Sequence, residues 1–237
     1  QKDLQKFNYT VSYNPEFIAQ GTIVRDQVNA DMVLIGEANS EVGDMVETIY
    51  TDHCVSNPRI CRMDRVSAEI TKLSLNCFLT TKISFANMIG DISNKVGGDT
   101  EKILKAIGSD SRVGNKYLRW GYGYGGPCFP RDNRALNIFA SENNIDAQIS
   151  RATDKMNELH LDYQLEEFVK NNPDKDKEII FDYVTYKPES TLLEESQQLQ
   201  FIIKLEGLGY NVIVKERESV INELKEKGIK FKNIVVR

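Results

Sequence analysis

The fold of this chain is decided by residues 65–96, which read RVSAEITKLSLNCFLTTKISFANMIGDISNKV. The stretch holds no proline and only one glycine, and its apolar residues recur at helical spacing, beginning with Val66, Ile70, Leu73 and Cys77. Gly97-Gly98 ends the run, so the pattern predicts one long helix. At about 1.5 Å per residue such a helix spans ~45 Å, more than a small bundle needs. We therefore expect it to reach into a partner and to support a homodimer or a higher homo-oligomer.

The residues after this helix predict a helical block and then a small α/β unit. Asp99 is expected to cap a short helix through Ile107, and further helices are expected over 131–143 and 147–171. The polar run 171–177 is the best domain boundary. Beyond it the pattern predicts a βαβαβ unit with a strand at 178–184, a helix at 194–208, a strand at 211–215, a helix at 217–227 and a strand at 233–236.

The first sixty residues predict mixed α/β structure. We expect a strand over 7–13, a turn at Asn14-Pro15-Glu16 into a short helix, a buried strand over 32–36, and a helix capped by Ser40 that runs to about Cys54. The predicted fold class is therefore α/β with a central all-α block. Its expected domains are 1–64, the remnant of an N-terminal α/β domain; 65–172, a helical dimerisation domain; and 178–237, a shortened C-terminal α/β domain.

Composition excludes several classes of function. The chain has 237 residues, of which 41% are hydrophobic, which suffices for one large or two modest cores. A net charge of −5 argues against a nucleic-acid binder, and no apolar run approaches the length of a membrane span. No secretory signal is visible, so Asn8-Tyr-Thr10 matches a glycosylation acceptor by chance and we expect a cytoplasmic protein.

The cysteines give no sign of a metal site. Cys54, Cys61, Cys77 and Cys128 lack CxxC spacing, and the two histidines, His53 and His160, are not placed to complete a zinc site. We expect no structural metal and four free thiols, three of them small core residues.

The fourth cysteine lies in the glycine-rich run 121–132, which reads GYGYGGPCFPRD. Pro130 suits the first turn of a helix, whose positive end, together with Arg131, would stabilise a thiolate on Cys128. The run also satisfies the G-x-G-x-x-G spacing of a dinucleotide-binding turn, but it lacks the preceding strand and the directly following helix. The alternative is a surface loop with an inert cysteine.

Other polar residues allow two interpretations each. Lys72 and Asn76 share a helical face, where they form either a functional pair or a solvated stripe continued by Thr80. Glu16 and Asp132 either take part in the chemistry or only stabilise the N-terminal ends of their helices.

The segment 111–120, which reads SRVGNKYLRW, interleaves cations with aromatic residues. Arg112, Lys116 and Arg119 could contact phosphates while Tyr117 or Trp120 stacks on a base. The alternative is a solvated basic turn.

Taken together, these segments resemble the nucleotide-sugar dehydrogenase family of UDP-glucose and GDP-mannose dehydrogenases. Five motifs carry the resemblance in order: Asn14-Pro-Glu-Phe-Ile-Ala-Gln-Gly21, Ala68-Glu-Ile-Thr-Lys-Leu-Ser-Leu-Asn-Cys-Phe78, Arg112-Val-Gly-Asn-Lys116, Gly125-Gly-Pro-Cys-Phe-Pro-Arg-Asp132, and Tyr186-Lys-Pro188 with Glu195-Ser196. They cover nearly the whole chain.

The resemblance implies an enzyme that oxidises a sugar primary alcohol to a carboxylate in two steps, with NAD as cofactor and a nucleotide sugar, expected to be a UDP-sugar, as substrate. It implies that Cys128 attacks the aldehyde and that the resulting thiohemiacetal is oxidised to a thioester, which water then hydrolyses. The family roles carried over are oxyanion stabilisation for Lys72 and Asn76, ordering of water for Asp132, and a general base for Glu16.

The resemblance also implies a set of contacts to substrate and cofactor. Arg131 is assigned to the cofactor. The implied substrate-binding residues are Phe17, Arg112, Lys116, Tyr117, Tyr124, Gly125, Phe129, Tyr186 and Lys187.

The chain departs from the family pattern in three places. The family's glycine fingerprint should precede the Asn14 motif by well over a hundred residues, whereas thirteen residues precede it here, so we expect the chain alone to lack turnover. Gln20 stands where an acidic residue is common, and Glu194 where arginine is common. Two interpretations remain: a piece or shortened form of a full enzyme, or a non-catalytic module that keeps the nucleotide-sugar and assembly surfaces. An unrelated cysteine hydrolase is disfavoured because neither histidine is near Cys128 in sequence.

Overall fold

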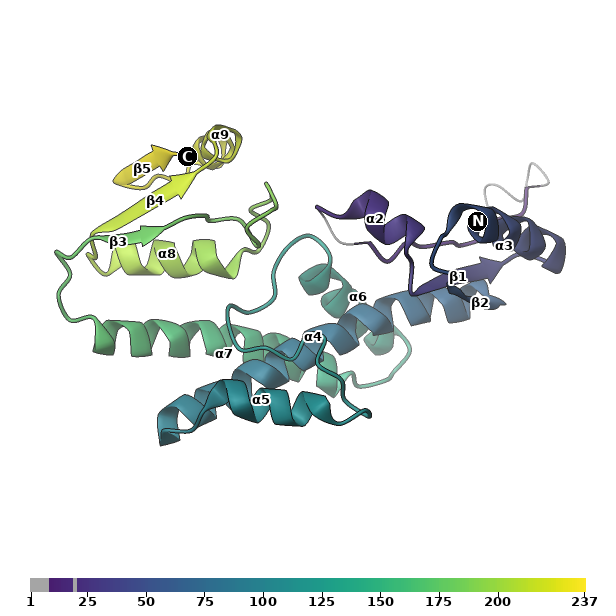
Figure 1. Ribbon diagram of the computed structural model, residues 1–237, viewed down its shortest axis with the longest axis horizontal. Helices are drawn as coiled ribbons and strands as arrows, with labels where there is room; N and C mark the ends of the chain where they lie inside the picture. The colour runs from purple at the N-terminus through teal and green to yellow at the C-terminus, as the bar shows by residue number, and fades with distance from the viewer. Residues whose placement is uncertain (1–8, 19–20) are drawn as a thin grey trace. The chain divides into compact units, whose positions relative to one another are not determined.

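The computed structural model describes residues 9–18 and 21–237. The chain forms two compact units, residues 1–75 and 76–237. Helix α4 (Arg65–Val96) passes from the first unit into the second, which confirms the predicted long helix (Figure 1). The three domains expected from the sequence stay a prediction.

The first unit contains a two-stranded parallel sheet. Strand β1 (Met32–Glu37) pairs with β2 (Arg59–Asp64), and Val33, Leu34 and Ile35 of β1 are buried. Helix α2 (Ile23–Val28) precedes β1, and helix α3 (Ser40–His53) crosses between the two strands. Strand β1 was predicted, but β2 was missed because Arg59, Arg62 and Asp64 break its apolar pattern.

Three expectations for the first unit are corrected. Residues 7 and 8 of the strand expected over 7–13 lie outside the described residues, and so does Gln20. The described part of that segment makes one antiparallel bridge, between Tyr13 and Gly36. The described residues 15–18 do not form the helix expected after Pro15, and α2 begins at Ile23. The reason is that Asn14 donates to the Leu34 carbonyl at 2.8 Å and accepts from the Tyr50 hydroxyl at 2.9 Å, so this segment is tied to its neighbours.

The third correction concerns the cap of α3. The side chain of Asn39, and not that of Ser40, accepts the N–H of Val42 at 2.9 Å. Asn39 has the extended backbone that a capping residue needs, whereas Ser40 is already helical.

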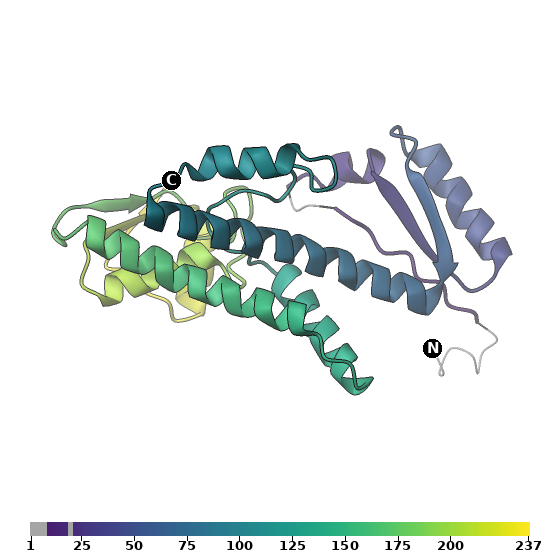
Figure 2. The ribbon, with the colours of Figure 1, turned by 90° about the horizontal axis from the view of Figure 1, so that it is seen from below.

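The second unit is built on residues 76–96 of α4. Helix α5 (Thr100–Ser109), capped by Asp99 as predicted, packs on α4 through Ala86 and Leu104. Helix α7 (Gln148–Asn171) contacts α4 where Ser84 donates to the Thr153 carbonyl at 3.1 Å. Figure 2 shows these three helices, together with α6 (Phe129–Glu142), which packs on α7. The predicted helical block is therefore confirmed.

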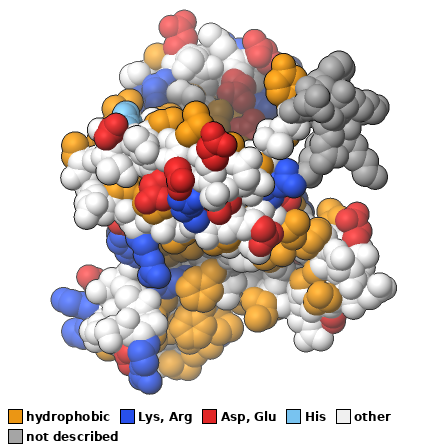
Figure 3. Space-filling view, turned by 90° about the vertical axis from the view of Figure 1, so that its right-hand side faces the viewer, with side chains coloured by type: hydrophobic (Ala, Val, Ile, Leu, Met, Phe, Trp, Pro, Cys, Tyr) orange, Lys and Arg blue, Asp and Glu red, His pale blue; other side chains and the backbone are white. Residues whose placement is uncertain are grey.

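On the face drawn in Figure 3, acidic and basic side chains lie among exposed hydrophobic ones. Such mixing fits the small net charge of −5.

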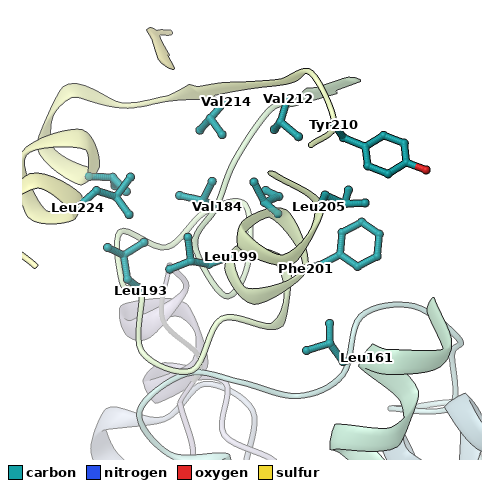
Figure 4. Close-up of a cluster of buried hydrophobic side chains, with 12 residues drawn as sticks. Leu161, Val184, Leu193, Leu199, Phe201, Leu205, Tyr210, Val212, Val214 and Leu224 are labelled. Carbon is teal, nitrogen blue, oxygen red and sulfur yellow. The ribbon is translucent and has the colours of Figure 1, made fainter. Parts of the chain in front are cut away.

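The predicted βαβαβ arrangement is confirmed. Strands β3 (Ile179–Phe181), β4 (Val212–Glu216) and β5 (Asn233–Val236) form a parallel sheet in the order β3-β4-β5, connected by helices α8 (Gln197–Gly207) and α9 (Glu218–Glu226). The core between sheet and helices contains Val184, Leu199, Leu205, Val212, Val214 and Leu224 (Figure 4). Leu161 of α7 joins this core, so the helical block and the sheet share buried apolar area within the second unit.

Candidate active site

Cys128 lies at the end of the glycine-rich loop and directly precedes helix α6. Its side chain is exposed, and Pro130 occupies the first turn as the sequence predicted. Gly126 has a φ of 83°, a conformation that glycine adopts without cost. The structure therefore presents the thiol to solvent at the positive end of a helix dipole.

Two side chains lie within electrostatic reach of the Cys128 sulfur. Burial raises the pKa of Tyr186, and negative charge on Cys128 raises it further. The hydrogen bond to Asp132 raises the pKa of Arg131, and Cys128 adds to this effect. A thiolate at position 128 thus has the cation of Arg131 as a neighbour.

A buried amide–carboxylate contact lies one turn beyond the thiol. Asn76 donates to Asp132 Oδ2 at 2.6 Å, and the two residues are 8% and 4% exposed. Arg131 donates from Nε to the other carboxylate oxygen at 3.0 Å. Asn76 and Thr80 are both buried, so the solvated-stripe interpretation of this face is wrong. Asp132 likewise does more than cap α6, because it links α6 to α4.

The first unit brings Lys72 together with the segment that contains Glu16. The Lys72 ammonium donates to the backbone carbonyl of Glu16 at 2.7 Å and lies 4.4 Å from the ring centroid of Phe17. The Glu16 side chain is exposed and caps no helix. The expectation that Lys72 and Glu16 face Cys128 and Asp132 joins residues of two units and stays a prediction.

The basic-aromatic segment forms a loop after α5. Arg112 donates to Asp110 from Nε at 3.0 Å and from Nη2 at 2.7 Å, which lowers the pKa of Asp110. Lys82 of α4 donates to the carbonyl of Val113 at 3.0 Å and so anchors the loop. Lys116 and Arg119 are exposed on the same segment.

Tyr117 connects this loop to the cysteine. It has a positive φ of 62°, and its ring meets that of Phe129 edge-on with 6.1 Å between centroids. The structure therefore brings Tyr117 beside the residue that follows Cys128.

Tyr124 is held inside the helical block. Its hydroxyl donates to Asp154, and burial followed by this bond raises its pKa. Asn157 of α7 accepts the N–H of Tyr124 and donates to its carbonyl, each at 2.9 Å. A Cβ on Gly123 would collide with the Asn157 side chain, which explains that glycine. The predicted contact of Tyr124 with substrate stays a prediction.

The start of the glycine loop rests on a buried polar network that sequence reasoning missed. Asp91 accepts from Trp120 Nε1 at 3.0 Å and contacts His160 Nδ1 at 2.7 Å. His160 Nε2 contacts the carbonyl of Gly121 at 2.6 Å. The only signal for this network in the sequence is the presence of one aspartate and one histidine within helices that pack together.

The other end of the loop contacts residues 184–196. The Tyr186 ring lies 2.8 Å from where a Cβ on Gly126 would be, and a Cβ on Gly125 would collide with the Glu195 carbonyl. The Lys187 ammonium lies 5.6 Å from the ring centroid of Tyr186. The structure thus places Gly125 and Tyr186 near Cys128, and Lys187 beside Tyr186.

A buried carboxylate that was also missed stands at the end of β4. Glu216 accepts the N–H of Val184 at 3.0 Å and that of Arg217 at 2.8 Å, and Arg237 donates to it at 3.2 Å. Burial alone would raise its pKa, but the backbone bonds from Arg217 and Val184 outweigh burial and hold the pKa below the usual range.

Two negative findings apply to the described part of the chain. No group of three or more histidine, cysteine and acidic residues there is placed to hold a metal ion. None of the helices described has both the length and the apolar character that a bilayer span requires.

Comparisons with known proteins agree on one family. Residues 66–159 match the family model for the UDP-glucose/GDP-mannose dehydrogenase family, central domain, and residues 1–54 match the model for its NAD binding domain. UDP-glucose 6-dehydrogenase of Rickettsia felis is 31% identical over 97% of this chain and 51% of its own length. UDP-glucose 6-dehydrogenase of Pseudomonas aeruginosa is 38% identical over 65% of this chain and 34% of its own length.

A solved structure gives the same result for the fold. The UDP-glucose dehydrogenase of Pyrobaculum islandicum superimposes with a TM-score of 0.83 at 26% identity, over 96% of this chain and 51% of that one. The chain thus spans about half the length of the Rickettsia felis and Pyrobaculum islandicum proteins, although nearly all of this chain aligns with each of them.

Proposed function

Because this chain belongs to the UDP-glucose/GDP-mannose dehydrogenase family, we propose that it carries the cysteine and substrate-binding part of an NAD-dependent nucleotide-sugar 6-dehydrogenase. The observation that carries the proposal is the exposed Cys128 at the start of α6, with Arg131 and the Asn76–Asp132 pair beside it. The substrate class proposed is a UDP-sugar, the class acted on by the relatives named above.

Cys128 is the proposed nucleophile. Its sulfur attacks the carbonyl carbon of a sugar aldehyde, and the carbonyl oxygen takes a proton to give a thiohemiacetal. The end of the α6 dipole and the Arg131 guanidinium stabilise negative charge on the sulfur before it attacks. Oxidation of the thiohemiacetal, with NAD as the proposed hydride acceptor, would give a thioester, which water would hydrolyse to the carboxylate and the free thiol of Cys128.

Asp132 and Asn76 are proposed to orient the reacting groups. Asp132 Oδ1 lies 3.0 Å from both Nε and Nη2 of Arg131, whereas Oδ2 accepts one bond, from Asn76, and keeps a lone pair for a water molecule. The Lys72 ammonium, held on the Glu16 carbonyl, supplies the positive charge proposed for the developing oxyanion, and the exposed Glu16 carboxylate supplies the base for hydrolysis.

The substrate is proposed to lie against the exposed cations and rings around the cysteine. Arg112 and Lys116 suit phosphate groups, and Tyr117 suits the face of a base or sugar. The remaining proposed contacts are those of Phe17, Tyr124, Gly125, Phe129, Tyr186 and Lys187.

NAD is proposed as the hydride acceptor, with Arg131 as one of its contacts. The described residues up to His53 supply one strand and the helix after it. A Cβ on Gly43, near the start of that helix, would collide with Glu37 and Arg62, so their ion pair packs closely against this turn of α3.

A homodimer formed through α4 belongs to the same proposal. Phe78, Phe85 and Ile92 repeat every seventh residue on α4 and are 63%, 41% and 54% exposed. A stripe of this spacing suits packing against the same stripe of a second copy. Phe85→Glu should convert a dimer to a monomer in sedimentation equilibrium, and a dimer that survives the change would place the interface elsewhere. A cytoplasmic site of action is also proposed, supported by four free cysteines.

Alkylation tests the proposed nucleophile. Iodoacetamide at neutral pH and low concentration should label Cys128 before Cys54, Cys61 and Cys77, as read by mass spectrometry of tryptic peptides. Labelling of Cys128 at or below the rate of Cys54 would count against the proposal.

Calorimetry separates the enzyme from the non-catalytic alternative. Binding of UDP-glucose that tightens when NAD is added supports the dehydrogenase. Binding of UDP-glucose with no response to NAD supports a nucleotide-sugar-binding module. Absence of any UDP-sugar binding contradicts both.

A further inference from the structure

The loop that carries Cys128 is docked on residues 184–196, the segment that leads into α8. Gly126 donates its N–H to the Glu194 carbonyl at 2.8 Å. Gly125 packs against the backbone of Glu195, whose carbonyl carbon lies 3.0 Å from where a Cβ on Gly125 would be. The contacts are therefore made by the two glycines just before the Pro127-Cys128 pair.

An ion pair fastens the same contact from helix α6. Arg134 pairs with the carboxylate of Glu195, and its Nε also donates to the Pro130 carbonyl at 3.0 Å. Glu195 has a positive φ of 47°, a conformation that is costly for a residue with a Cβ. The surroundings must hold Glu195 in that conformation, and the Arg134 guanidinium is the partner that its side chain has.

The same segment reaches the carboxyl edge of the parallel sheet. Ser196 caps α8 by accepting the N–H of Leu199 at 3.1 Å and donates to the Val184 carbonyl at 2.7 Å. Glu216, at the end of β4, accepts the N–H of Val184. Ligands of open α/β sheets bind at this edge, so one segment touches both a ligand-binding edge and the cysteine loop.

We propose that Arg134 and Glu195 are positioning residues whose ion pair fixes the Cys128 loop on residues 184–196 and so sets the reactivity of the thiol. The inference rests on the proposed function, because a nucleophile contributes most when its position relative to the substrate is fixed. It goes beyond that function by assigning a role to two residues that touch no reacting atom.

The test compares alkylation rates of Cys128 in two variants, each of which replaces a charged side chain by an uncharged one. Arg134→Met removes a positive charge near the thiol and Glu195→Gln removes a negative one. An effect of charge alone would slow alkylation in the first variant and speed it in the second. Loss of a positioning contact slows it in both, because the released loop lets the Cys128 sulfur shift from its fixed position relative to the α6 dipole and Arg131. Because a half-exposed ion pair is weak, its loss should slow the alkylation of Cys128 by only about two- to five-fold.

Three further variants sharpen the comparison. The exchange of charges in Arg134→Glu with Glu195→Arg should restore the rate. Arg134→Lys keeps the charge and should stay within about two-fold of the unsubstituted chain. Arg151→Met is the matched control, since Arg151 pairs with Asp146 at similar exposure, 49% and 53% against 52% and 47%, and it should leave the rate unchanged.

Opposite changes in Arg134→Met and Glu195→Gln, unchanged rates in both, or no recovery in the exchange variant would overturn the positioning role. Thermal unfolding of each variant identifies any that fails to fold, in which case Arg134→Lys and the exchange variant decide. The proposed function fails by a different result, namely slow labelling of Cys128 relative to Cys54 in the unsubstituted chain.

Discussion

Gly125→Ala tests whether the cysteine loop depends on its close approach to Glu195. The added Cβ would collide with the Glu195 carbonyl oxygen and lie 3.0 Å from its carbonyl carbon. Carbon atoms pack best at about 3.5–4.0 Å, so the backbones must separate by at least ~0.5 Å, and no flexible side chain is present to yield. Overpacking of this kind costs about 1–3 kcal/mol.

The assay pairs urea unfolding with alkylation of Cys128. We expect Gly125→Ala to lower the free energy of unfolding by about 1–3 kcal/mol and to slow alkylation, because the loop moves off residues 184–196. Gly121→Ala is the matched control, since a Cβ there meets nothing within 4 Å, and it should change neither quantity. Equal behaviour of the two variants in both measurements would refute the argument that close approach at Gly125 sets the position of the loop.

Three further predictions follow from buried polar groups. Because the folded-state pKa of Glu216 is lowered, its contribution to stability is present above the ordinary glutamate pKa and is lost as the pH falls below it. Glu216→Gln should therefore flatten the acid limb of a stability–pH curve, and an unchanged limb would contradict this. Burial raises the pKa of Cys77 to about 11, so this thiol should resist alkylation at neutral pH until urea unfolds the chain, and early labelling would show that the site opens. Asn157→Leu leaves the N–H and carbonyl of Tyr124 unpaired and should cost about 2–5 kcal/mol in urea unfolding, whereas a cost below ~1 kcal/mol would mean that the loop finds other partners.

The elements predicted correctly are those whose signals are local. The long helix follows from residues 65–96 alone, and Asp99 caps α5 by a bond to Lys102, three residues away. The missed and misplaced elements depend on distant partners. Asn14 bonds to Leu34 and Tyr50, which no local pattern reveals, and β2 is a strand because β1 pairs with it despite its charges.

The candidate site shows the same difference between residues with local signals and residues with distant partners. Cys128, Asp132 and Arg131 were found because they lie within one short motif, whereas the Asp91–His160 contact joins residues 69 positions apart and the Arg134–Glu195 pair joins residues 61 positions apart. Charged residues are usually solvated, so neither pair stands out in the sequence. The bond from the Tyr124 hydroxyl to Asp154 is likewise invisible in the sequence, and the contact of Tyr124 with substrate stays a prediction.

The exposure of Cys128 explains why so many buried groups surround its loop. An exposed loop rich in glycine loses more conformational entropy on ordering than other segments do, so a fixed thiol requires compensating contacts. The loop obtains them along its length: His160 at Gly121, Asn157 at Tyr124, and the carbonyl of Glu194 at Gly126. The side chains of His160 and Asn157 are buried, and the group that would react is exposed. Removing any one attachment should therefore affect the reactivity of Cys128 more than its exposure, since the sulfur already faces solvent.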